Sequence, residues 1–130
     1  MDKSSFSQYK SQGGVKRLFR AFGYSLKGLK AALKNEAAFR QECALAVILL
    51  PAAFWLGRSA TEIFLLIASV VLVLIVELIN SAIEALADTI STAHHPLLGQ
   101  AKDLGSAAVL LCLVLAGGWW GYICVDRFLL

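Results

Sequence analysis

The 130-residue sequence is 58% hydrophobic and only 16% charged, with a formal net charge of +3. A soluble domain carries about 25% charged residues, so this composition excludes an ordinary soluble domain and indicates a membrane protein. The length leaves room for about three spans of roughly 20 residues each and one further element. Nine Lys or Arg residues and two acidic residues lie in residues 1–40, whereas residues 41–130 hold three basic and seven acidic residues.

A basic amphipathic helix is the first element expected, at about residues 15–34, after a flexible polar tail at residues 1–14. Its apolar residues recur at helical spacing within an arc of about 100°, and lysines and arginines occupy the sides and back. A helix of this kind is typical of the membrane interface. The apolar face consists of Val15, Leu18, Phe19, Phe22, Leu26, Leu29 and Leu33.

Three apolar segments follow and predict membrane spans at about residues 36–57, 63–88 and 104–125. A short turn is expected at 57–62, and a loop at 89–103, which contains His94, His95 and Pro96. The predicted fold is therefore all-α and integral to the membrane, with three transmembrane helices, an N-terminal amphipathic surface helix, and residues 15–130 forming one domain. The basic N-terminus is expected to stay cytoplasmic, which also places the 89–103 loop on the cytoplasmic side.

Five polar residues lie on one face of the otherwise apolar second span: Glu77, Asn80, Ser81, Glu84 and Asp88. At 100° per residue they fall within an arc of about 100°. One carboxylate deep in an apolar helix costs roughly 2.5–3.5 kcal/mol even on the scale that gives the lowest values. Two or three carboxylates on one face of such a helix therefore need a physical reason.

The predicted topology brings further polar residues toward this face. Glu36 lies at the cytoplasmic start of the first span, and Lys102 with Asp103 at the start of the third, while Glu77 lies about 10 Å deeper than Glu84. Two carboxylates at an aqueous edge can hold Mg²⁺ with nucleotide phosphates, and a nearby lysine can neutralise a transferring phosphoryl group. A deeper carboxylate can accept a proton from a lipid hydroxyl. The residues thus suggest phosphoryl transfer to a lipid alcohol.

The spacing of these polar residues alone leaves two other interpretations of the same face open. Intramembrane Glu, Asn and Ser also serve ion or proton passage, and they form hydrogen bonds between helices without chemistry. The sequence has no P-loop and no glycine-loop kinase signature. His94 and His95 lack a third ligand at a useful spacing for zinc.

Three ordered blocks resemble the prokaryotic diacylglycerol kinases, which are small integral-membrane lipid kinases. The blocks are NEAAFRQE (Asn35–Glu42), ELINSAIE (Glu77–Glu84) followed by Asp88, and AKDLGSAA (Ala101–Ala108). The resemblance implies a homotrimer in the bacterial inner membrane that uses Mg²⁺ and ATP to phosphorylate diacylglycerol to phosphatidate. Undecaprenol is the alternative acceptor within the family, and no nucleic-acid partner is implied.

The resemblance also implies roles for individual residues. Glu77 matches the proton-accepting base, and Glu36 and Glu84 match metal ligands that also contact ATP. Further nucleotide contacts are implied for Arg17, Tyr24, Asn80, His94, His95, Lys102 and Asp103. Lipid contacts are implied for Ser25, Ala38, Phe39, Arg40, Gln41, Glu42, Trp55, Ser106 and Trp120.

The Glu77 face also bears on the oligomer. A lone three-helix protomer is expected to leave this face partly open to lipid, whereas a neighbouring protomer could cover it. The same neighbour could contribute groups to a shared site.

Overall fold

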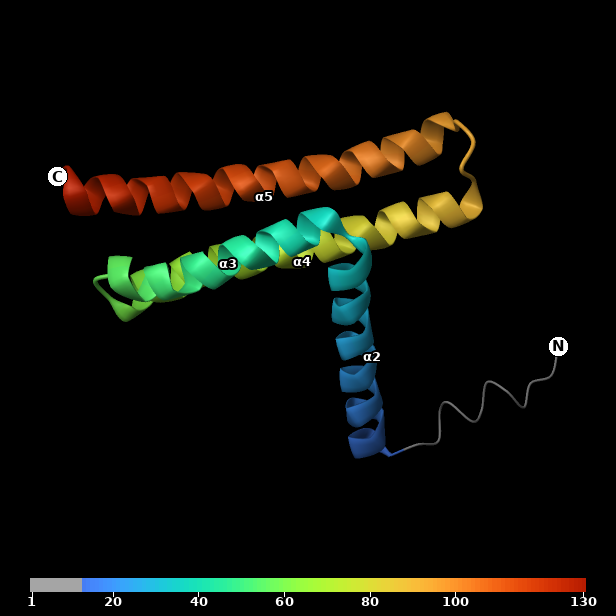
Figure 1. Cartoon of the computed structure of the whole chain (residues 1–130), viewed down its shortest axis with the longest axis horizontal. Coiled ribbons are helices and arrows are strands. Elements are labelled where there is room, and N and C mark those ends of the chain that lie inside the picture. The colour runs from blue at the N-terminus through green and yellow to red at the C-terminus, as the bar shows by residue number, and fades with distance from the viewer. Residues whose placement is uncertain (1–12) are drawn as a thin grey trace. The chain divides into compact units, whose positions relative to one another are not determined.

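A computed structural model describes residues 13–130 of the chain (Figure 1). The described residues form four helices and no strand: α2 (Gly14–Asn35), α3 (Ala37–Leu56), α4 (Ala60–Ile90) and α5 (Pro96–Phe128). The predicted all-α class is confirmed. Except for Gly13 and Gly14, the predicted tail at residues 1–14 lies outside the described residues, and Gly14 already begins α2.

Helix α2 belongs to one compact unit of the chain, and α3, α4 and α5 form the other, Glu36–Leu130. Helix α2 runs without interruption through Gly23 and Gly28. The side chains of its predicted apolar face are exposed, with Leu18 71% and Phe19 73% exposed. An exposed apolar face on a basic helix suits the membrane interface, and the location of α2 at that interface stays a prediction.

The three helices of the second unit are each long and apolar enough to cross a membrane. Helix α4 has 31 residues and α5 has 33, so they extend about 46 Å and 50 Å. The hydrocarbon core of a bilayer is about 30 Å thick, so both helices are long enough to project beyond it. The polar residues at the end of α4 and at the start of α5 therefore lie on helical turns that can reach the headgroup layer.

The start of α5 differs from the expectation. A loop was predicted at residues 89–103, but only residues 91–95 connect α4 to α5, and residues 96–103 are helical. Pro96 occupies the start of α5, where its fixed φ suits a helix. Backbone N–H groups in the first turn have no acceptor within the helix, so the missing N–H of proline costs no hydrogen bond there. His94, His95, Pro96 and Gly99 together indicated a loop, yet proline is favoured at the start of a helix and a helix tolerates an isolated glycine such as Gly99.

Helix α4 packs against both α3 and α5, and α3 crosses in front of it in Figure 1. The tightest packing is near the α3–α4 turn, where Leu66 of α4 meets Ala53 and Leu56 of α3 and Ile123 of α5. Leu66 is 0% and Ile123 1% exposed. The three helices are thus joined at this end by close apolar packing.

The α3–α4 turn is held to α5 by two arginines. Arg58 in the turn forms an ion pair with Asp126 of α5, and Arg127 of α5 donates to the Leu56 carbonyl oxygen at 2.9 Å. The hydrogen bond to Asp126, followed by that to Glu62, raises the pKa of the Arg58 guanidinium above its ordinary value. Ser59 caps α4 by accepting a hydrogen bond from the Glu62 N–H at 3.1 Å.

Candidate functional site

The polar face of α4 becomes more exposed from Glu77 toward the C-terminal end of the helix. Glu77 is 5% and Asn80 7% exposed, Glu84 is half-buried, and Asp88 is exposed. Burial within the bundle therefore decreases from Glu77 to Glu84, and the depth of the two carboxylates in the membrane stays a prediction. Ionisable groups are rare in the apolar interior of a membrane protein, and they mark functional sites there.

One protomer shields only part of the polar face of α4. Glu77 and Asn80 are buried, whereas Ser81 and Glu84 are half-buried and Asp88 is exposed. Burial of the Glu77 carboxylate therefore requires no second protomer. Covering of the rest of the face by a neighbouring protomer stays a prediction.

Three carboxylates gather around the buried part of this face. Glu77 lies within electrostatic range of both Glu84 and Glu36, which is the N-cap residue of α3. The Asn80 side chain donates a hydrogen bond from Nδ2 to Glu84 Oε1 at 3.2 Å. When ionised, the carboxylates repel one another, and a bound cation would offset that repulsion.

Lys102 brings a positive charge to the same end of the bundle. Its Nζ donates to Asp88 Oδ1, and it lies within electrostatic range of Glu84. Helix α5 thus supplies the cation that was predicted beside Glu84. Asp103, the next residue, is exposed.

The donor set at this site fits Mg²⁺. In the described part of the chain, no three His, Cys, Asp or Glu side chains form a metal-binding group. Mg²⁺ commonly takes only one or two carboxylates and completes its octahedron with water and substrate phosphates. The Glu36 side chain makes no capping hydrogen bond, and Glu84 receives one bond from Asn80 at a single oxygen. These two carboxylates can therefore serve as a partial ligand set.

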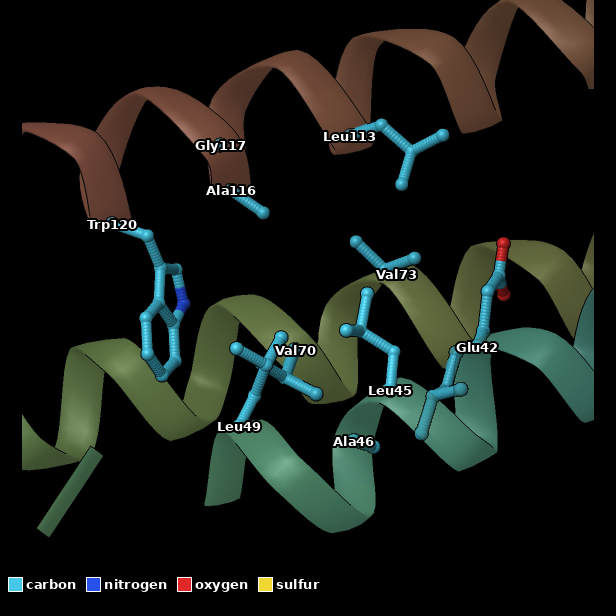
Figure 2. Close-up of a pocket in the computed structure, with 11 residues that line it drawn as sticks. Glu42, Leu45, Ala46, Leu49, Val70, Val73, Leu113, Ala116, Gly117 and Trp120 are labelled. Carbon is cyan, nitrogen blue, oxygen red and sulfur yellow. The ribbon is translucent and has the colours of Figure 1, made fainter. Parts of the chain in front are cut away.

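An apolar cavity of about 270 Å³ lies among α3, α4 and α5 (Figure 2). Glu42 lies at one end of the cavity and Trp120 at the other. Glu42 is also within electrostatic range of Glu77, and the Trp120 indole donates to Ser69 Oγ at 3.0 Å. Every other residue of the lining is apolar: Leu45, Ala46, Leu49, Val70, Val73, Leu74, Leu113, Ala116 and Gly117.

The remaining predicted site residues are more dispersed. Phe39 is buried at 3% exposure in the first turn of α3, whereas Ala38, Arg40 and Gln41 around it are exposed. Trp55 lies at the other end of α3 from Glu36, with its ring 5.7 Å from that of Phe128.

Ser106 and the two histidines are also exposed. His94 lies in the α4–α5 connection, and His95 is the N-cap residue of α5. Arg17, Tyr24 and Ser25 are exposed on α2, in the other unit, so their joining this site stays a prediction.

Sequence reasoning missed two residues and one pairing at the site. Asp88 was assigned to the polar face, but its ion pair with Lys102 was not predicted, and Ser69 was not connected with Trp120. Gly105 was not singled out either, although it is buried and lies against Asn80. The small residues from Gly105 to Ala108 were the available signal, because small residues let membrane helices approach closely.

Comparison with known proteins decides among the open interpretations. A sequence profile of the family described as prokaryotic diacylglycerol kinase matches residues 23–124. The chain belongs to the prokaryotic diacylglycerol kinase family. Because this is a family of kinases, membership favours phosphoryl transfer over ion passage and over helix–helix hydrogen bonding alone. Together with the three apolar helices, it also indicates a membrane protein of a prokaryotic family.

Individual relatives support the same assignment. A protein named diacylglycerol kinase from Haemophilus influenzae is 52% identical over 110 residues, which cover 85% of this chain and 93% of the relative. One of the same name from Escherichia coli K12 is 51% identical over 115 residues, or 88% and 94% of the two chains. A third, from Helicobacter pylori 26695, is 43% identical over 116 residues, or 89% and 91%.

Proposed function

We propose that this chain transfers the γ-phosphoryl group of ATP to the hydroxyl of diacylglycerol and so forms phosphatidate and ADP. The observation that carries this proposal is the burial of Glu77 near two different environments. On one side is the half-buried Glu84, which accepts a hydrogen bond from Asn80. On the other is an apolar cavity that ends at Glu42. Membership of the diacylglycerol kinase family supports the choice of lipid.

Glu77 acts as the general base in this proposal. It takes the proton of the lipid hydroxyl as the hydroxyl oxygen attacks the γ-phosphorus, while the bond from that phosphorus to the bridging oxygen of ADP breaks. Burial excludes water from the carboxylate, which disfavours hydrolysis of ATP as a side reaction. Glu77 is also the deepest carboxylate of the face, where a lipid hydroxyl lies closer than bulk water.

Nucleotide binding falls to the groups nearer the end of the bundle. Glu36 and Glu84 would hold Mg²⁺, which, when bound with ATP, neutralises charge on the phosphate oxygens. Lys102 adds a positive charge beside the phosphates, and Asn80 orients Glu84 through its hydrogen bond. The further nucleotide contacts proposed here come from Arg17, Tyr24, His94, His95 and Asp103.

The cavity in Figure 2 supports binding of a hydrocarbon chain. Its lining is apolar except at Glu42, and Glu42 lies within electrostatic range of Glu77. An acyl chain in the cavity would therefore direct its polar end toward the carboxylates. Small-ligand sites commonly combine an apolar lining with few polar groups in this way.

The proposal also includes a cellular location and an oligomeric state. The basic N-terminal segment favours a cytoplasmic N-terminus and active site, in the bacterial inner membrane. A homotrimer is proposed from the family resemblance, and α5 offers exposed apolar residues to a neighbour or to lipid. Cross-linking in active membranes should trap trimers, and recovery of monomers alone would contradict the assembly.

Transfer of label from ATP to lipid tests the function. Membranes that contain the protein, with γ-labelled ATP, Mg²⁺ and diacylglycerol, should yield organic-soluble label, and membranes without it should not. Undecaprenol in place of diacylglycerol tests the alternative acceptor. Absence of label with either lipid would contradict the kinase proposal, and protein-dependent ion flux in vesicles would then support ion passage.

A further inference from the structure

Gly105 of α5 is buried directly against the carboxamide of Asn80 on α4. A Cβ built on Gly105 would lie 2.3 Å from Asn80 Oδ1 and 3.3 Å from Asn80 Cγ. Only a hydrogen atom fits between the α5 backbone and this oxygen. Asn80 Oδ1 is itself buried and has no conventional hydrogen-bond partner, so its neighbour here is the Gly105 backbone.

The other end of the same carboxamide makes the bond to Glu84. Because Oδ1 faces Gly105 and Nδ2 donates to Glu84 Oε1 at 3.2 Å, the two contacts together define the orientation of the amide. A methyl group at position 105 would meet the far end of a short side chain rather than rigid backbone. Rotation of the carboxamide is the least costly response, and that rotation breaks the bond to Glu84.

We propose that Gly105 is a positioning residue for Glu84 and acts through Asn80. By admitting the carboxamide against α5, Gly105 directs the amide donor at Glu84 and holds that carboxylate in one orientation for the Mg²⁺-bound phosphates. The inference rests on the proposed role of Glu84 in nucleotide binding. It assigns Gly105 no contact with substrate.

Gly105→Ala tests this role, and Gly118→Ala is the matched control on the same helix. Nothing lies within 4 Å of a Cβ at Gly118, so both variants change helix propensity equally and only one disturbs Asn80. With the full chain in membranes, Gly105→Ala should raise the Mg²⁺ concentration for half-maximal lipid phosphorylation by about tenfold, while kcat at saturating Mg²⁺ changes far less. Gly118→Ala should match the wild type.

An NMR measurement detects the contact between Gly105 and the Asn80 side chain without an activity assay. The sequence has two asparagines, Asn35 and Asn80, so ¹⁵N-asparagine labelling yields two pairs of side-chain NH₂ cross-peaks, which Asn80→Ala assigns. Gly105→Ala should shift the Asn80 amide signal and leave that of Asn35 unchanged. Gly118→Ala should leave both signals in place.

A double-mutant cycle connects the two residues. In the Asn80→Ala background no carboxamide remains to be displaced, so Gly105→Ala should add no further increase in the Mg²⁺ requirement. Full additivity of the two changes would overturn the inference. If Gly105→Ala alone fails to fold, Asn80→Ala/Gly105→Ala should fold, and failure of the double variant would overturn it too.

Failure of this inference and failure of the proposed function give different results. Labelled lipid from the wild type, with an unchanged Mg²⁺ requirement in Gly105→Ala, would overturn the role of Gly105 alone. No labelled lipid from the wild type would overturn the proposed function, and the role of Gly105 with it.

Discussion

Glu77 and Glu84 lie seven residues apart on one face of α4 but have different surroundings. Glu77 is 5% exposed and lies within electrostatic range of Glu42, near the apolar cavity. Glu84 is half-buried and accepts a hydrogen bond from Asn80. A buried carboxylate beside an apolar cavity suits proton transfer, whereas a more accessible and oriented carboxylate suits binding of a hydrated cation. The two residues should therefore respond differently to the same substitution.

Glu77→Gln should lower turnover by about 100-fold or more, because it removes the proposed base and keeps the size of the side chain. Binding of MgATP should remain close to that of the wild type, since the proposed metal ligands are intact. Lipid phosphorylation at saturating ATP and direct nucleotide binding to the purified protein measure the two effects. Glu62→Gln, at the other end of α4, is the control for loss of one carboxylate from this helix.

Glu84→Gln should raise the Mg²⁺ requirement by about tenfold, with a smaller change in turnover at saturating Mg²⁺. The physical reason is loss of a charged oxygen ligand, whose place the amide fills only weakly. Mg²⁺ titration of lipid phosphorylation at fixed ATP measures the effect. If Glu77→Gln and Glu84→Gln gave the same modest rise in the KM for ATP, the proposed division of roles would be wrong.

At the scale of elements, α4 is the central helix because it packs against both of its neighbours in the second unit. Its two ends are used differently. Near the α3–α4 turn, Leu66 packs in a core with residues of α3 and α5, and the arginines Arg58 and Arg127 connect the turn to the end of α5. Toward the α4–α5 connection, polar contacts replace this apolar packing. The apolar packing of α4 and its proposed functional residues are therefore separated along the helix.

Leu66→Ala should destabilise the bundle by about 2 kcal/mol, toward the low end of the range for buried leucines. Lipid tails are as apolar as leucine, so the loss is mainly one of packing rather than of transfer from water. Unfolding of the purified protein from detergent micelles by SDS, followed by circular dichroism, measures the change. Leu111→Ala, at a position 69% exposed, should be nearly neutral, and equal losses in the two variants would contradict the packing described here.

At the scale of the whole second unit, a cavity of about 270 Å³ joins its three helices beside the carboxylates. None of the helices forms this space alone, since residues of α3, α4 and α5 all line it. Its apolar lining and its end at Glu42 would let the proposed lipid chain and the proposed nucleotide bind in neighbouring parts of one small protein. The volume of the cavity should therefore limit which lipids are phosphorylated.

Ala116→Phe should lower phosphorylation of long-chain diacylglycerol more than that of a short-chain analogue, because the ring fills part of the cavity. An effect of about tenfold on kcat/KM for the long-chain lipid is expected from lost apolar burial. Val114→Phe places the same ring at an exposed position two residues earlier, and its two kcat/KM values should match those of the wild type. Equal losses for both lipids in Ala116→Phe would contradict a role of the cavity in binding acyl chains.

The sequence by itself determined the class of this protein and the polar face of α4. Long apolar runs predict membrane-spanning helices because length and hydropathy are local properties. The arrangement of Glu77, Asn80 and Glu84 on one face follows from helical periodicity, and three sequence blocks indicated the family. The local sequence was misleading at residues 96–103, where Pro96 and Gly99 indicated a loop although α5 begins at Pro96.

Only the tertiary structure decided which helix faces meet. The pairing of Lys102 with Asp88, the contact of Gly105 with Asn80 and the burial of Glu77 in a single chain all depend on how α3 and α5 pack on α4. The periodicity of one helix cannot specify these contacts, because they arise from the combined shapes of side chains on separate helices. The apolar cavity also depends on this packing, because it is the space that the three packed helices leave unfilled.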